Sequence, residues 1–441
     1  MRNTIFALST GHPRSGVAVI RISGPGVRFG LETLTGSVPA PRTARLGEIR
    51  DHAGMVLDRG IVLFFPAPHS FTGEDVAEFQ IHGSRASIAA VLAALSELDG
   101  YRIAEPGEYT RRAFENGRID LTAVEGLSDL IRAETEAQRR QALDQADGSL
   151  RIRYEGWARR LTHARAMIEA ELDFSDEEDV PGSVAERIWP DMERLANEIS
   201  LHLKQARTGE IVRDGFRVAL VGPPNVGKSS LLNSLAGRDV AIVSDMPGTT
   251  RDVIECRLDI GGNLVLLQDT AGLRETESPV EIEGIRRSRL TESNADLVLE
   301  LRDLSIPGSY APVALEPASD RLVVWTKSDL VGANAALTPD YGLIISNKNG
   351  EGLDELIANI AIRLASLDLV SPEGLPTRER HVSLLRDCLD ELEQALQQES
   401  APIEIRSEHL RFAALALGRI TGAVDVEDLL GVIFSEFCVG K

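Results

Sequence analysis

The stretch that most constrains this chain is Gly222-Pro-Pro-Asn-Val-Gly-Lys-Ser229, a glycine-rich segment between two apolar runs. Val218–Val221 before it has the length and composition of a short buried strand, and Ser230–Leu235 after it carries apolar residues at helical spacing. A strand, the pattern Gly-x-x-x-x-Gly-Lys-Ser and a helix, in that order, predict a phosphate-binding loop. Its backbone N–H groups can curl around an anion, and the helix N-terminus adds partial positive charge. We expect Lys228 to reach the β- and γ-phosphates of a nucleotide and Ser229 to ligate Mg²⁺.

The length and charge of the chain limit what can surround this loop. At 441 residues the chain is too long for one hydrophobic core, and about three domains are expected. Its 47 basic and 68 acidic residues give a net charge of −21, which opposes non-specific binding to nucleic acid. A nucleic-acid partner would therefore have to meet a local basic patch or be presented by another protein. Apolar segments stay shorter than the ~18 residues of a membrane span, and three widely spaced cysteines favour a reducing cytoplasm.

The pattern along the chain predicts three domains in four segments. Residues 1–118 alternate strand-like and helix-like stretches, as expected of a compact α/β domain, with a helix from Ala86 to Leu98 capped by Ser84. Residues 119–210 are helical, residues 211–370 alternate strands and helices around the phosphate loop, and residues 371–441 are helical again. Because the last block is too short to bury its own apolar stripes, we expect both helical flanks to build one discontinuous domain, with the nucleotide domain inserted between them.

Two polar segments after the phosphate loop carry residue types that can sense a γ-phosphate. Gly248-Thr-Thr-Arg-Asp252 follows the apolar run 240–243. A threonine hydroxyl there, which we assign to Thr250, can complete the Mg²⁺ shell when a γ-phosphate is present. Asp269-Thr-Ala-Gly272 follows the apolar run 264–267, so that Asp269 can lie near Mg²⁺ at a strand end while the N–H of Gly272 contacts the γ-phosphate.

Two later segments indicate which base is bound. Thr326-Lys-Ser-Asp329 follows the apolar run 322–325, and the Asp329 carboxylate can accept hydrogen bonds from guanine N1–H and N2–H₂, which adenine does not present. Ser346-Asn-Lys348 can offer backbone contacts to the base. Within one α/β domain, these segments in this order predict a GTP site. Its expected residues are Asn225, Val226, Gly227, Lys228, Ser229, Ser230, Ser244, Asp245, Met246, Pro247, Gly248, Thr249, Thr250, Asp269, Thr270, Ala271, Gly272, Thr326, Lys327, Ser328, Asp329, Ser346, Asn347 and Lys348.

The residue that follows Asp-Thr-Ala-Gly is Leu273. In Ras-like enzymes a glutamine there orients the attacking water, which a leucine cannot do. Hydrolysis must therefore recruit another polar group. The following segment supplies several candidates: Arg274, Glu275, Glu277, Glu281 and Glu283.

Three further motifs carry a resemblance to a known family. They are Phe71-Thr-Gly-Glu-Asp75, Pro106-Gly-Glu-Tyr-Thr-Arg-Arg-Ala-Phe114 and the terminal Phe437-Cys-Val-Gly-Lys441. Together with the inserted nucleotide domain, they make the chain resemble the MnmE/TrmE family of tRNA-modification GTPases over essentially its whole length. The resemblance implies a multidomain fold class, α/β plus all-α. It would comprise an N-terminal α/β folate-binding and dimerisation domain, a discontinuous helical domain and an inserted Ras-like P-loop GTPase domain.

The resemblance also implies how the gap at Leu273 is filled. A K⁺ ion beside the phosphates would supply the charge that an arginine finger gives in other GTPases, as two GTPase domains pair across a dimer. The implied K⁺ ligands are Asn225, Ser244, Met246 and Thr249, and the implied Mg²⁺ ligands are Ser229 and Thr250. The water-orienting glutamate falls on Glu281, with Glu275 as the second choice.

A folate one-carbon donor, 5-formyl-tetrahydrofolate or methylene-tetrahydrofolate, is implied for the N-terminal domain. The matching positions are Arg21, Glu78, Arg118 and Lys441. Arg21 and Lys441 suit the glutamate carboxylates of the folate, and Glu78 suits the donor edge of the pterin. Arg118 stands where a relative has lysine. Cys438 lies in the same tail, but nothing nearby in the sequence obviously activates its thiol, so a role in closing the folate pocket is favoured over a nucleophilic one.

Two positions depart from the family pattern. Thr326 replaces the usual asparagine, removing an amide that contacts the base and braces the phosphate loop, and Asn347 replaces the usual alanine. Because Asp329 is kept, we expect weaker nucleotide affinity while the preference for guanine survives.

The resemblance predicts a cytoplasmic, K⁺-stimulated GTPase that works as a homodimer with an FAD-dependent partner and without a membrane. Together they would install an aminomethyl or carboxymethylaminomethyl group at C5 of the tRNA wobble uridine. One alternative is a ribosome-assembly GTPase that binds RNA without modifying it, which would be expected to append an RNA-binding module. Another is a membrane-remodelling GTPase, which would need an amphipathic or apolar membrane segment. Neither feature is evident in the sequence.

Overall fold

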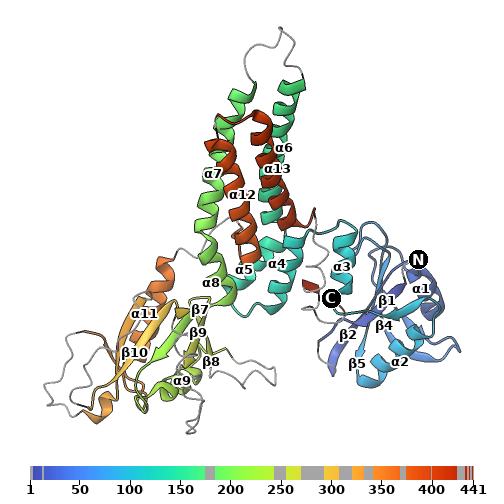
Figure 1. The fold of residues 1–441 in the computed structure, drawn as a ribbon. Coiled ribbons are helices and arrows are strands. Elements are labelled where there is room, and N and C mark those ends of the chain that lie inside the picture. Colours follow the sequence, from blue (N-terminus) through green and yellow to red (C-terminus); the bar gives the residue numbers. More distant parts are fainter. Residues whose placement is uncertain are drawn as a thin grey trace, which may run out of the picture. The chain divides into compact units, whose positions relative to one another are not determined.

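The structure is a computed structural model of the chain (Figure 1). It describes residues 3–11, 14–173, 184–242, 255–269, 293–306, 320–331, 341–367, 374–398, 400–424, 433–434, 437 and 440. Contacts divide the chain into two compact units. The first comprises Met1–Ser128, Gln145–Ala185 and Gln397–Lys441, and the second comprises Asp129–Asp144 and Glu186–Leu396.

The first unit is built on a six-stranded sheet with the order β3-β4-β5-β2-β1-β6. Its strands are β1 (Thr4–Leu8), β2 (Ser15–Ser23), β3 (Arg45–Arg50), β4 (Val56–Phe65), β5 (Val76–Gly83) and β6 (Tyr101–Ile103). All neighbouring strands are antiparallel except β1 and β6, which run parallel. The hydrophobic residues alternate along β2 and β5, so one face of the sheet forms the core.

Two helices cover that core face. Helix α1 (Val27–Thr35) contributes Val27 and Leu31, and helix α2 (Arg85–Ser96) contributes Val91. As expected, Ser84 caps α2, with its hydroxyl accepting a hydrogen bond of 3.0 Å from the N–H of Ser87. Because side chains alternate along a strand, the residues between the core positions of β2 and β5 lie on the opposite face. That face carries Arg21 and Glu78, two of the four expected folate residues.

Helix α3 (Glu108–Glu115) packs on this opposite face, beside β1. Tyr109 of α3 forms a small buried cluster with Ile5, Ala7 and Ala104. The other long elements described in this unit are helices. Helix α4 (Leu121–Arg132) begins in it, and helix α6 (Ser149–Asp173) packs along helix α13 (Ile403–Thr421), as Figure 1 shows.

The second unit contains the sheet that carries the phosphate loop, with the order β12-β11-β10-β7-β9-β8. Its strands are β7 (Phe216–Val221), β8 (Glu255–Ile260), β9 (Asn263–Asp269), β10 (Leu297–Asp303), β11 (Asp320–Thr326) and β12 (Leu343–Ile344). Neighbouring strands are parallel except for the edge strand β8. Helices α9 (Lys228–Ala236) and α11 (Leu353–Ser366) bury Leu231, Leu235 and Leu356 in its core.

The remaining described elements of the second unit are helical. They are α5 (Glu136–Ala146), α7 (Val184–Lys204), α8 (Ala206–Asp214), the 3₁₀ turn η1 (Ser328–Leu330) and α12 (Glu379–Gln397). Helices α12 and α13, which follow the nucleotide domain, therefore fall largely in different units. Among the helices that the structure describes, none combines the length and the apolar character needed to cross a membrane.

Candidate functional site

The phosphate loop lies where β7 ends, at the centre of the second sheet. Strand β7 has β9 on one side and β10 on the other, so the chain crosses to opposite sides of it. Ligands of such sheets bind outside the carboxyl ends of the strands at this switch point. The loop has a left-handed backbone at Asn225 (φ +61°) and Gly227 (φ +108°). At Gly222 (φ +155°) a Cβ would lie 2.6 Å from the carbonyl oxygen of Leu301, so a glycine is required there.

Lys228 and Ser229, expected to bind phosphate and Mg²⁺, are the first two residues of α9. The Lys228 ammonium donates to the carbonyl oxygens of Gly222 (2.7 Å) and Pro223 (3.1 Å). Burial lowers the pKa of Lys228, and the Asp269 carboxylate opposes this shift. The Ser229 hydroxyl donates to Oδ2 of Asp269 over 3.2 Å. A hydroxyl and a carboxylate oxygen at a helix N-terminus fit a Mg²⁺ ion that also contacts a phosphate.

The two segments expected to bind guanine lie at the same edge of the sheet, after β11 and β12. The Ser346 hydroxyl donates to Oδ1 of Asp329 over 2.7 Å, which orients the carboxylate expected to bind guanine. Lys327 has a left-handed backbone (φ +62°), and its ammonium lies 2.6 Å from Oδ2 of Asp303. Although burial acts to raise it, hydrogen bonds from Lys327 and Ser305 hold the pKa of Asp303 below its usual value.

The same two segments also hold the phosphate loop, in a way that the sequence did not predict. The hydroxyl of the fully buried Thr326 donates to the carbonyl oxygen of Val226 over 2.7 Å. Although threonine stands at position 326 where the family usually has asparagine, its side chain therefore still donates a hydrogen bond to the loop. The side-chain amide of Asn347 donates to the carbonyl oxygen of Gly227 over 3.2 Å. The sequence predicts only backbone contacts from this segment. A side-chain contact with a loop 120 residues away leaves no pattern among neighbouring residues from which it could be predicted.

Several predicted residues lie outside the described part of the chain. For the nucleotide and its ions they are Ser244, Asp245, Met246, Pro247, Gly248, Thr249, Thr250, Thr270, Ala271, Gly272, Glu275 and Glu281, as well as Leu273. For the folate site they are Lys441 and Cys438. Of the implied K⁺ ligands, only Asn225 is described.

The sheet of the first unit brings two of the expected folate residues together. Arg21 of β2 and Glu78 of β5 are directly paired across the strands, and their side chains form an ion pair of 3.0 Å. The hydroxyl of Tyr109, from α3, donates to the backbone carbonyl of Arg21 over 2.7 Å. The Arg21 guanidinium lies 5.8 Å from the centre of the Tyr109 ring. Arg118 is exposed, and its side chain approaches Gly73.

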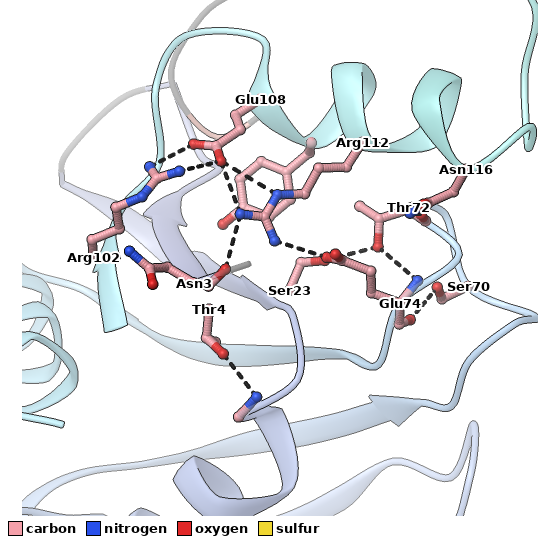
Figure 2. A network of polar contacts seen from close by, with 12 residues as sticks. Asn3, Thr4, Ser23, Ser70, Thr72, Glu74, Arg102, Glu108, Arg112 and Asn116 are labelled. Carbon is pink, nitrogen blue, oxygen red and sulfur yellow. Dashed lines mark hydrogen bonds and ion pairs between the residues drawn. The ribbon is translucent and has the colours of Figure 1, made fainter. Parts of the chain in front are cut away.

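Two motifs that carried the family resemblance meet in one buried polar network (Figure 2). Arg112 donates to Glu108 (2.9 Å), to Glu74 (2.9 Å) and to the backbone carbonyl of Asn3 (2.9 Å). Glu74 also accepts a hydrogen bond of 2.8 Å from Ser23. The motif that contains Glu74 is thereby joined to the motif that forms α3. The sequence showed both motifs but not that they contact each other.

Charge balance explains why this network can be buried. Glu108 accepts from both Arg102 and Arg112. Although burial acts to raise it, these hydrogen bonds hold the pKa of Glu108 below its ordinary value of 4.5. A carboxyl group whose pKa is lowered by folding stabilises the folded state. This contribution is complete when the pH is above the group's ordinary pKa, and it is lost as the pH falls through the lowered value. The network therefore stabilises the N-terminal domain at neutral pH and weakens in acid.

Replacing Arg112 by methionine should destabilise the N-terminal domain by about 3–5 kcal/mol, because two buried carboxylates lose a cationic partner. Urea unfolding followed by circular dichroism would measure the loss. The matched control is Arg111→Met, since Arg111 is exposed and forms an ion pair with Glu115 across one helical turn. The control should change stability by less than about 0.5 kcal/mol. Equal losses in the two variants would contradict a stabilising role for the network.

The C-terminal tail docks on the first unit. Phe434 and Phe437 pack with Val124 in a buried cluster. Farther along, Gly440 (φ +95°) lies so close to the end of β1 that a Cβ would be 2.3 Å from the carbonyl oxygen of Leu8. The Ser9 hydroxyl donates to the Gly440 carbonyl over 2.9 Å. Gly440 thus lies beside β1, the strand that pairs with the strand of Arg21.

A phosphate loop at the switch point of a largely parallel sheet, with the Asp329 carboxylate at the carboxyl ends of the same strands, is the arrangement of a P-loop GTPase. Residues 4–118 match the model of the GTP-binding protein TrmE N-terminus, and residues 121–438 match that of the MnmE helical domain. The chain belongs to the MnmE family of tRNA modification GTPases.

Full-length relatives agree with this assignment. The tRNA modification GTPase MnmE of Rhizobium etli is 55% identical over 441 residues, which is 100% of this chain and 99% of its own. The protein of that name from Brucella ovis is 52% identical over 440 residues, 100% of this chain and 98% of its own. Among solved structures, the G domain of the T. maritima FeoB iron transporter is 27% identical, with a TM-score of 0.26, over 34% of this chain and 98% of its own.

Proposed function

We propose that this chain is a K⁺-stimulated GTP hydrolase that modifies tRNA together with an FAD-dependent partner. The pair would add an aminomethyl or carboxymethylaminomethyl group to C5 of the wobble uridine, using a folate one-carbon donor. The observation that carries the proposal is the presence of two candidate sites in one chain. One is the phosphate and guanine edge of the second sheet, and the other is the Arg21–Glu78 face of the first sheet.

The proposed roles in the GTP site follow from its oxygen donors and charges. Lys228 would bind the β- and γ-phosphates, and Ser229, with Thr250, would hold Mg²⁺ near Asp269. Asn225 would be a K⁺ ligand, since it is an exposed residue of the phosphate loop with an amide oxygen. A bound K⁺ would supply positive charge where charge develops during phosphoryl transfer. Glu281, or else Glu275, would orient the attacking water.

The proposed folate site uses the face of the N-terminal sheet that carries Arg21 and Glu78. Binding of the folate would break the ion pair between them and free both side chains to contact it. Docking of Gly440 beside β1 supports a contribution from Lys441, the next residue. Arg118 completes the proposed set, and Cys438 would help to close the pocket.

A second copy of the chain is proposed to cover part of the same face. Leu46 of β3 is 77% exposed and Ile61 of β4 is 37% exposed. The two residues are paired across the strands and share the face of Arg21 and Glu78. Large apolar side chains exposed side by side on a sheet favour an interface. The proposed homodimer would act on tRNA in the cytoplasm.

Cells that lack this chain should lose the modified wobble uridines from their tRNAs. Mass spectrometry of nucleosides from purified tRNA measures this directly, and re-expression of the intact chain should restore the modification. Unchanged modification would reject the enzymatic role and favour a regulatory GTPase that binds RNA or assembles ribosomes without modifying it.

The wild-type protein should prefer GTP over ATP, and Asp329→Asn should weaken GTP binding by about tenfold to a hundredfold. The reason is that the carboxylate, oriented by Ser346, is the acceptor proposed for guanine N1–H and N2–H₂. Competition of unlabelled GTP and ATP against a fluorescent guanine nucleotide measures both effects. Equal competition by ATP at the wild-type site would contradict the assignment of Asp329.

A further inference from the structure

The phosphate loop has an unfavourable backbone that neighbouring groups must hold in place. Asn225, which is not a glycine, has a φ angle of +61°. Such a conformation persists in a non-glycine residue only where the surrounding structure fixes it. The carbonyl groups of the next two residues, Val226 and Gly227, each accept one side-chain hydrogen bond from the base-binding side of the site. The Gly227 carbonyl also accepts the N–H of Leu231 in α9.

These two hydrogen bonds come from different strands. Thr326 ends β11 and reaches Val226, while its hydroxyl also lies 3.2 Å from the carbonyl of Arg302. Asn347 follows β12 and reaches Gly227 over 3.2 Å. A Cβ on Gly227 would lie 3.2 Å from that amide nitrogen, so the absence of a side chain at residue 227 permits the close approach.

The orientation of the Asn347 amide is set by its partner. A carbonyl oxygen can only accept, so the NH₂ group must face Gly227. The opposite atom, Oδ1, is buried and has no hydrogen-bond partner among the described residues. The Asn347 backbone is also fixed, because its carbonyl accepts a hydrogen bond of 3.1 Å from Ser234 of α9. Asn347 therefore contacts the residue before α9 and a residue near its end.

We propose that Asn347 is a positioning residue of the nucleotide site, which braces the phosphate loop from the base-binding side and supplies the amide that position 326 lacks. The preceding residue, Ser346, orients Asp329 through its hydroxyl. One short segment thus fixes both the guanine acceptor and the loop that receives the phosphates. The proposal rests on the assignment of this site to GTP.

The test is a set of affinity measurements on the full chain with fluorescent GDP and with unlabelled GTP as competitor. Asn347→Ala should weaken both nucleotides about tenfold, because it removes the only side-chain donor that the described residues give the Gly227 carbonyl and leaves it the N–H of Leu231 alone. Asn347→Asp keeps the shape but places an oxygen against that carbonyl, and it should lose at least as much. Asn349→Ala is the matched control. It should leave affinity unchanged, since the Asn349 side chain accepts a hydrogen bond from the N–H of Glu351.

A rescue variant distinguishes the loss of one stabilising hydrogen bond to the phosphate loop from a general loss of structure. Adding Thr326→Asn to Asn347→Ala should recover affinity to within about threefold of the wild type, because an amide then returns near the loop from the other strand. Thr326→Asn alone, measured in parallel, is the reference for the double variant, since it exchanges the Thr326 hydroxyl for an amide while Asn347 stays in place. Failure of this rescue in a double variant that melts at the wild-type temperature would overturn the proposal, as would wild-type affinity in Asn347→Ala.

Inosine triphosphate tests whether Asn347 instead contacts the base. This nucleotide lacks the guanine N2 amino group, so a brace predicts the same fold loss for it as for GTP in Asn347→Ala. A loss confined to GTP would show that the side chain recognises the base and would overturn the brace. If the wild-type chain bound neither nucleotide, the GTP assignment would fail, a result distinct from a failure of Asn347 alone.

Discussion

Replacement of Lys228 by alanine is expected to reduce GTP hydrolysis by about a hundredfold or more, the size of effect seen when one preorganised donor to developing charge is removed. The Lys228 side chain lies across the phosphate loop, where two loop carbonyls hold its ammonium and only 6% of the residue is exposed. The charge is therefore in place before a nucleotide arrives, and alanine removes it without refolding the loop. Single-turnover hydrolysis with saturating enzyme measures the loss.

Two further variants make this expectation specific. Lys228→Arg should also be impaired, because the larger planar guanidinium cannot occupy the position of a compact ammonium between the carbonyls of Gly222 and Pro223. Lys204→Ala, at the exposed end of α7, is the control and should hydrolyse GTP at the wild-type rate. Hydrolysis by Lys228→Ala within threefold of the wild type would contradict the role of this lysine.

Exchange of potassium for sodium at constant ionic strength is expected to slow GTP turnover by at least about tenfold. In other GTPases an arginine finger raises the rate of GTP hydrolysis by about 10³–10⁵. The cation proposed to replace it here would be bound poorly if it were Na⁺. Na⁺ is smaller than K⁺, so a site sized for K⁺ coordinates it less completely. Phosphate release in matched KCl and NaCl buffers measures the difference.

Asn225→Gly is the matched variant for this experiment. Glycine adopts the left-handed backbone of residue 225 without strain, so the phosphate loop keeps its shape and only the side-chain ligand is lost. Turnover should fall, and the difference between the two salts should shrink. If the wild-type protein released phosphate equally fast in potassium and sodium, the proposed compensation for Leu273 would be wrong.

The sequence by itself determined the local elements around the GTP site. Gly222-x-x-x-x-Gly-Lys-Ser229 between a strand and a helix is sufficient to predict β7, the phosphate loop and α9, because each depends on residues close together in the chain. The order of the later motifs placed Asp269 at the end of a strand and Asp329 in a segment that follows another. The structure has Asp269 as the last residue of β9 and Asp329 in the 3₁₀ turn after β11. Family motifs identified the chain as a whole, without indicating what most of their residues contact.

Only the tertiary structure decided which distant side chains meet. The pairing of Arg21 with Glu78 depends on the register of β2 against β5, and the network of Arg112 depends on how α3 lies against a loop 38 residues earlier. The hydrogen bond from Asn347 to Gly227 depends on the crossovers that make β12 and β7 parallel members of one sheet, so that their carboxyl ends lie on the same side of it. Local patterns encode elements because backbone hydrogen bonding and side-chain periodicity act over a few residues. Contacts across the chain depend on register and packing, which no short segment specifies.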